Sequence, residues 1–242
     1  MKEKATMCFV LLMMGAMTTA AGFIYAQEGA IRPVTLGQAM PEFTLPQFQG
    51  GELSLSQLKG KNVILLFPRG LAGEDHWCHI CNYQYAELLE LEEEKQIRKT
   101  YNLEIVYVFP YSAEMIANWI DTFPDQMADI ENWKHPEDPE GLDERGKRRM
   151  AFATQAFPKH FVFEKGKIPT PFPILIDEER TVSKGLGIFT EEWGSSKIDQ
   201  NVPTVFLIDK EGIVRFKYFS QNTFDRPSFD YLLTFLDTMM GK

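Results

Sequence analysis

The residues best suited to chemistry are the two cysteines of the stretch HWCHIC. Cys78 and Cys81 are separated by two residues, Trp77 precedes the first cysteine, and His76 and His79 lie beside it. A thiolate is both a nucleophile and a metal ligand, and two neighbouring thiols can form a disulfide. The stretch could therefore be a redox centre, a metal site or a structural disulfide.

Two of these possibilities are weak. A disulfide between Cys78 and Cys81 closes a tiny loop, which removes little entropy from the unfolded chain. Structural zinc takes four ligands, and the two cysteines and two histidines of HWCHIC would crowd all four into one short stretch. Copper suits soft thiolates and would need a distant histidine, for which His135 and His160 are the candidates. We expect no metal and no cofactor other than a redox-active disulfide, with a copper metallochaperone as the lowest-ranked alternative.

The N-terminus has the order of a secretory signal. Lys2 and Lys4 precede an apolar run, and small residues close it before Ala26. We therefore expect a signal peptide at residues 1–26, a linker at 27–39 and export, in a bacterium to the periplasm. The alternative is an uncleaved membrane anchor. After cleavage only Cys78 and Cys81 would remain as cysteines, in a compartment where thiols can be oxidised.

The composition sets limits on partners. The chain has 242 residues, 44% hydrophobic and 24% charged, with a net charge of −9. It is long enough for one large domain. The acidic balance gives no general attraction to nucleic acid or to anionic lipid, so we expect neither as a partner.

The elements around the cysteines alternate between strands and helices, which predicts an α/β fold. The continuous apolar runs at 62–67 and 103–109 indicate strands buried on both faces. A helical pattern follows the cysteines, so Cys78 should lie at a helix N-terminus. The remaining expected elements are a hairpin at 42–55, a helix capped by Ser112, a strand at 172–177, a helix at 181–189, a hairpin at 204–219 and a closing helix at 228–240.

Residues from about 124 to 171 break this alternation. The region is rich in proline and charge, and one helical stretch, residues 144–157, lies within it. It is shorter than an ordinary domain. We therefore expect a largely helical insertion within one domain at residues 40–242.

The order of these elements resembles the thioredoxin fold, and more narrowly the redoxin family. That family groups AhpC/TSA peroxiredoxin-like proteins with TlpA-type thiol–disulfide oxidoreductases. The resemblance rests on the N-terminal hairpin, on FPRG, WCHIC and Gln84 in the cysteine segment, and on FPILID and VPTVFLIDKEGIVRF later in the chain. It implies a central mixed sheet flanked by helices.

The resemblance implies a redox role for the cysteine pair. At a helix N-terminus Cys78 would have a lowered pKa, and a protonated His79 would lower it further. Cys78 would attack a disulfide and Cys81 would resolve the mixed disulfide, while Trp77 would cover the site and leave one sulfur accessible. Protein thiols or disulfides would be the partners, with an external electron donor. In thioredoxin-like proteins a cis-proline loop faces the cysteines, so Pro203 is expected to be cis.

The main alternative is a thiol peroxidase that reduces hydroperoxides. Peroxiredoxins carry the reactive cysteine in a Pro-x-x-x-Thr-x-x-Cys loop, and Pro68 and Arg69 resemble its start. The segment here is longer and lacks the threonine, which favours disulfide exchange. Gln84 favours the peroxidase, because TlpA-type reductases often carry glutamate there. Arg69 would then be a cation near the thiolate; its ordinary interpretation is a surface or carboxylate-paired arginine.

Overall fold

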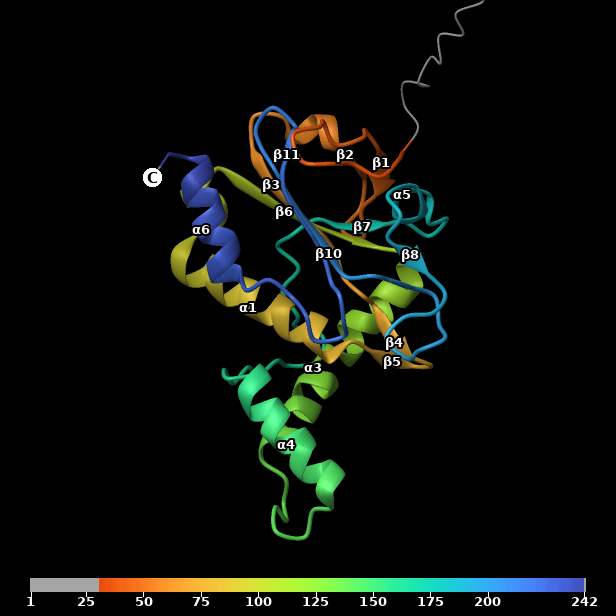
Figure 1. Ribbon diagram of the computed structural model, residues 1–242, viewed down its shortest axis with the longest axis vertical. Helices are drawn as coiled ribbons and strands as arrows, with labels where there is room; N and C mark the ends of the chain where they lie inside the picture. Colours follow the sequence, from red (N-terminus) through yellow and green to blue (C-terminus); the bar gives the residue numbers. More distant parts are fainter. Residues whose placement is uncertain (1–30, 242) are drawn as a thin grey trace, which may run out of the picture.

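The computed structural model describes residues 31–241. At its centre is a five-stranded mixed sheet in the order β11-β10-β3-β6-β7 (Figure 1). The middle strand, β3, is parallel to its neighbour β6 and antiparallel to its other neighbour β10. The strands of this sheet are β3 (Asn62–Phe67), β6 (Leu103–Phe109), β7 (Ile174–Ile176), β10 (Thr204–Ile208) and β11 (Val214–Phe219).

Each face of the sheet has its own hydrophobic core, because alternate residues of a strand point to opposite faces. On one face Ile64 and Ile105 pack with residues of the helices α1, α3 and α6. On the other face Leu65 and Val106 pack against α5, η1 and the segment around Phe43. The helices are η1 (Leu55–Leu58), α1 (His79–Lys95), α2 (Ile97–Thr100), α3 (Ala113–Lys134), α4 (Glu144–Ala156), α5 (Thr181–Gly185) and α6 (Phe229–Met239).

Most of the elements expected from the sequence are confirmed. The N-terminal hairpin is β1 (Thr44–Pro46) paired with β2 (Glu52–Ser54). The two apolar runs are β3 and β6 with the expected bounds, and the hairpin β10–β11 and the helix α6 close the chain. Ser112 caps α3, and its side chain accepts a hydrogen bond from the backbone of Met115 at 3.3 Å. The predicted signal peptide and residues 27–30 of the predicted linker lie outside the described residues.

The expected boundary at about residue 124, where the insertion was to interrupt the alternating strands and helices, is wrong for the helix that Ser112 caps. The helix α3 continues through Pro124 to Lys134. An internal proline costs a helix about 3 kcal/mol, but α3 buries a stripe of apolar side chains on both sides of it. These side chains are Ile116, Trp119, Phe123, Met127 and Ile130. Burying one such side chain contributes about 1.5–3 kcal/mol, so the stripe outweighs the proline.

The helix α4 lies beyond the end of the sheet layers (Figure 1). It packs against α3, and its Phe152 contacts Phe224 in the loop between β11 and α6, with ring centroids 4.5 Å apart. Phe157, which follows α4, packs on Tyr83 of α1 at 4.9 Å. The inserted region therefore contacts both the cysteine-bearing helix and the loop before the last helix.

Two short ladders were not expected. The strands β4 (Leu71–Gly73) and β5 (His76–Trp77) form a small hairpin just before the cysteines. The strands β8 (Phe189–Thr190) and β9 (Gln200–Asn201) pair ahead of β10. Among the described residues, none of the helices is long and apolar enough to cross a membrane.

Candidate active site

The two cysteines lie at the start of α1, as the sequence predicts. Cys78 is the N-cap residue, and its backbone N–H donates to the carbonyl oxygen of Gly70 at 2.9 Å. Cys81 lies in the first turn of the helix. Both are free thiols, and both are buried, with 4% and 8% of their surfaces exposed. The expectation that one sulfur would be accessible at the surface is therefore wrong.

Trp77 packs into the core beneath the cysteine segment. Its ring meets those of Phe109 and Tyr111 edge to face, and its indole N–H donates to Asn118 at 3.0 Å. Because Trp77 is buried in the core, it does not cover the cysteines as the sequence predicted. These core contacts of Trp77 hold the cysteine that follows it in place.

Tyr111 holds the loop that faces the cysteines. Its phenolic oxygen accepts a hydrogen bond from the backbone N–H of Leu71 at 2.8 Å and donates to the carbonyl oxygen of Asp199 at 2.9 Å. Gly70 has a φ of +78°, and the Cβ atom of any larger residue at this position would overlap the Tyr111 ring. The glycine of FPRG is thus required by close packing as well as by backbone conformation.

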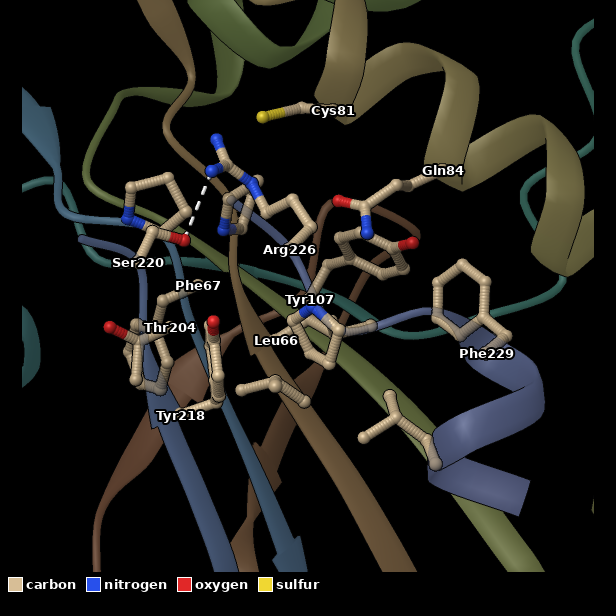
Figure 2. A pocket seen from close by; sticks show the side chains of 15 residues that line it. Leu66, Phe67, Cys81, Gln84, Tyr107, Thr204, Tyr218, Ser220, Arg226 and Phe229 are labelled. Carbon is tan, nitrogen blue, oxygen red and sulfur yellow. Dashed lines mark hydrogen bonds between the residues drawn. The ribbon is translucent and has the colours of Figure 1, made fainter. Parts of the chain in front are cut away.

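Cys81 borders a small cavity between α1, the central strands and the start of α6 (Figure 2). Its volume is about 30 Å³. A water-sized molecule needs about 10–15 Å³ by this measure, so the cavity can hold one or two. Cys78 does not line it. The lining is mostly apolar; its polar side chains come from Cys81, Gln84, Tyr107, Thr204, Tyr218, Ser220 and Arg226.

Arg226 is a candidate site residue that sequence analysis missed. It lies in the loop before α6, far from the cysteines in sequence, and its guanidinium group turns toward the Cys81 sulfur (Figure 2). Its Nη1 donates to Ser220 Oγ at 3.0 Å and to the carbonyl oxygen of Asp225 at 2.8 Å. No spacing motif links Arg226 to the cysteines, so only the folded chain identifies it.

The charge of Arg226 acts on the cysteine pair. Burial raises the pKa of Cys81, but a hydrogen bond from Cys78 and the positive charge of Arg226 outweigh burial and bring this pKa to about 6. The pKa of Cys78 is raised well above its usual value, first by its hydrogen bond to Cys81 and then by burial. These opposite shifts favour the thiolate on Cys81 over the thiolate on Cys78. This differs from the expected lowering at Cys78.

Arg69 is buried, but its guanidinium group points away from the sulfurs. It donates to Gln200 Oε1 at 2.7 Å and to Ser196 Oγ at 2.8 Å, and it lies over the Trp193 ring. It is neither a surface arginine nor paired with a carboxylate. Its backbone N–H, however, hydrogen bonds to Cys81 and helps to lower the pKa of that thiol.

Pro203 lines the cavity together with Cys81, so the proline loop faces the cysteines as expected. The expected cis bond is wrong, because the described residues contain no cis peptide bond. The trans form is the ordinary state of an X–Pro bond. Here the proline directly precedes β10, whose first residue, Thr204, pairs with Phe67 on one side and Phe219 on the other.

His79 does not supply the charge that the sequence suggested. It is 6% exposed, and its ring lies against those of His76 and Trp133, with centroids 4.8 and 4.3 Å away. Burial, and then the proximity of His76, lower its pKa from 6.5 to about 4, although Asp129 at 3.4 Å opposes this. His79 is therefore neutral at pH 7, and it connects α1 with α3.

This burial predicts a pH-dependent stability. The pKa of His79 is lower in the folded chain, so between pH 6.5 and 4 the unfolded chain binds more protons. Stability should be complete above about pH 6.5 and should fall by up to about 3 kcal/mol as the pH approaches 4. Urea unfolding at pH 7 and pH 4.5 measures how much free energy of unfolding is lost between these two pH values. This loss should be smaller in His79→Gln than in the natural chain. The exposed His135→Gln is the matched control, and equal losses in all three proteins would contradict the assignment.

The metal alternatives gain no support from the geometry. Among residues 31–241 there is no group of three or more histidine, cysteine, aspartate or glutamate side chains placed to hold a metal ion. His160, one of the two distant candidates for copper, pairs through Nδ1 with Glu131 at 2.8 Å.

Comparison with known proteins agrees with this fold. The model of the AhpC/TSA family matches residues 36–217, and the chain belongs to this family. A search of curated proteins gave no match.

Among solved structures, the chain is similar to a cysteine-to-serine mutant of peroxiredoxin 6 from Arenicola marina. The TM-score is 0.55 at 14% identity, with 86% of this chain and 74% of that chain covered. It is also similar to the reduced 2-Cys peroxiredoxin of Plasmodium vivax, with a TM-score of 0.51 at 18% identity and coverage of 86% and 83%. These similarities confirm the thioredoxin fold expected from the sequence.

Proposed function

We propose that this protein is a dithiol oxidoreductase that reduces small hydroperoxides with the Cys78–Cys81 pair. The observation that carries the proposal is the cavity at Cys81. It holds a molecule the size of one or two waters, and hydrogen peroxide has two heavy atoms. A protein disulfide needs a sulfur that a second chain can reach, and neither sulfur here is at the surface.

The site contains the groups that such a reaction requires. A thiolate attacks the peroxide, and the lowered pKa of Cys81 favours one. Arg226 provides positive charge where negative charge develops on the leaving oxygen. In sum, ROOH and the two thiols give ROH, water and the disulfide, and an external dithiol then returns the pair to its reduced form.

Disulfide exchange with protein partners is the second candidate. It is favoured by the two-residue spacing at the N-terminus of α1 and by the absence of the threonine of the peroxiredoxin loop. For this function the loops around the cysteines would have to move, because both sulfurs are buried. Export to the periplasm, which the sequence predicts, would suit either function.

One pair of assays separates the two functions. Purified protein with dithiothreitol should consume hydrogen peroxide rapidly, and it should reduce insulin little faster than dithiothreitol alone. The double variant Cys78→Ser/Cys81→Ser is the matched control and should have neither activity. Fast insulin reduction without peroxide consumption would favour disulfide exchange, and inactivity in both assays would refute a redox function for this pair.

A further inference from the structure

The two cysteines of the motif have different surroundings. Cys81 borders the cavity, and the backbone N–H of Arg69 hydrogen bonds to it. Cys78 does not border this cavity, and its backbone N–H is directed to Gly70. A substrate in the cavity would therefore meet the second cysteine first.

Arg226 has capacity for a further anionic partner. Its Nε and Nη2 are buried, and neither makes a regular hydrogen bond within the described part of the chain. Buried N–H groups of a charged side chain are costly to leave unpaired. Within the described residues, Nη1 donates to oxygen atoms of its own loop, and a side-chain hydrogen bond between Arg226 and Cys81 helps to lower the pKa of that thiol. An anion on the cavity side would satisfy the other two nitrogens.

No carboxylate neutralises this arginine in an ion pair within residues 31–241. Its neighbour Asp225 is occupied elsewhere, since it accepts hydrogen bonds from the Tyr218 hydroxyl and from the backbone N–H of Gln221. The other titratable groups around Cys81 are Cys78, Tyr107 and Tyr111. Both tyrosine pKa values are raised, so these side chains are neutral at pH 7. Arg226 is thus the cation that faces the cavity sulfur.

We propose that Cys81, the second cysteine, is the attacking sulfur, that Arg226 is its catalytic counter-ion and that Cys78 is the resolving thiol. This proposal rests on the redox function proposed above and reverses the order expected for a Cys-x-x-Cys motif. It is carried by the position of Cys81 on the cavity and by the guanidinium group of Arg226, which turns toward the Cys81 sulfur (Figure 2) and hydrogen bonds to it.

The chemical step balances without further groups. The Cys81 thiolate attacks one peroxide oxygen, the S–O bond forms as the O–O bond breaks, and sulfur is oxidised by two electrons while the peroxide is reduced. The leaving oxygen takes a proton from solvent and departs as ROH. The Cys78 sulfur then attacks the Cys81 sulfenic acid, so that the S–S bond forms and water leaves with the Cys78 proton. An external dithiol reduces the disulfide.

The assignment of the sulfurs is tested by trapping. Cys78→Ser and Cys81→Ser proteins are each treated with one equivalent of hydrogen peroxide and then with dimedone, and the adduct is located by mass spectrometry. We expect rapid sulfenic acid formation at Cys81 in Cys78→Ser, and at least tenfold slower reaction at Cys78 in Cys81→Ser. Faster reaction at Cys78 would overturn the proposal and leave the proposed function intact. Failure of both cysteines to react, with the natural chain inactive toward peroxide, would overturn both.

The role of Arg226 is tested by thiolate absorbance at 240 nm, which a purely structural role would not change. In the Cys78→Ser background, Arg226→Gln should raise the midpoint of thiolate formation by about one pH unit or more. With a midpoint raised from about 6 to about 7, the thiolate fraction at pH 6, and with it the peroxide rate, falls about fivefold. Arg226→Lys should restore part of the shift because it keeps the charge.

Arg215→Gln is the matched control. Arg215 lies at the other end of β11 and pairs with Asp209, so its removal should change neither the midpoint nor the rate. Should the trapping variants not fold, the midpoint and peroxide rate of Arg226→Gln are measured with both cysteines present. An unchanged midpoint and rate in that protein would overturn the role of Arg226.

Discussion

Gly70→Ala should destabilise the protein by about 2–5 kcal/mol and greatly reduce its redox activity. Left-handed backbone costs an L-residue about 1–2 kcal/mol, and overpacking typically costs about 1–3 kcal/mol. Both costs apply here, because φ is +78° and the added methyl group would overlap the Tyr111 ring. Tyr111 cannot move freely, since its hydroxyl group bonds to Leu71 and Asp199.

The activity should fall for a related reason. The carbonyl oxygen of Gly70 accepts the backbone hydrogen bond of Cys78, so a shift of the loop displaces the cysteine pair. Urea unfolding gives the stability, and peroxide consumption with dithiothreitol gives the activity. Gly73→Ala is a good control because Gly73 ends the strand β4 that directly follows Gly70, and an added methyl group there meets only the His76 Cβ at 3.7 Å. Equal stability and equal peroxide consumption in the two variants would show that the Tyr111 ring does not exclude a side chain at Gly70.

Tyr85→Ala should lower the free energy of unfolding by about 3–5 kcal/mol, as for other large aromatic side chains removed from a core. Tyr85 is fully buried on α1. Its ring meets those of Tyr107, Trp119, Phe123 and Phe172. It joins the cysteine-bearing helix to β6, to α3 and to the segment before β7.

Tyr85→Phe separates packing from hydrogen bonding. It keeps the ring and loses only the hydrogen bond from the hydroxyl group to the carbonyl oxygen of Pro169, at 2.8 Å. That loss should cost about 1 kcal/mol. Chemical unfolding of both variants at pH 7 measures the difference. A phenylalanine variant as unstable as the alanine variant would mean that the hydroxyl group, rather than the aromatic cluster, anchors α1.

The central elements could be predicted from the sequence because their patterns are local. Asn62–Phe67 and Leu103–Phe109 are continuous apolar runs, and such runs form strands buried on both faces. The position of Cys78 at the start of α1 followed from the uninterrupted helical pattern after it. The continuation of α3 past Pro124 was missed, because local proline rules carry no information about the tertiary packing that overrides them.

The candidate site was only half predictable for a similar reason. The spacing of the cysteines identifies them as site candidates, but the residues that surround them come from distant segments of the chain. Arg69 was singled out and turned out to offer its backbone to Cys81 rather than its guanidinium group. Arg226 has no motif around it, and it reaches the cavity only because β11 and α6 bring its loop there. The isomer of Pro203 likewise depends on the fold around it rather than on the residues beside it.

The position of Arg226 in the chain has a consequence for biosynthesis. Ribosomes make Cys78 and Cys81 well before Arg226, so for part of synthesis the growing chain carries HWCHIC without this cation. Until β11 and α6 have docked, Cys81 lacks the charge that favours its thiolate. On the proposed role of Arg226, the newly made protein would pass through synthesis with ordinary, slowly reacting thiols. On the same proposal, the rate at which Cys81 reacts would also report whether the last helix has docked.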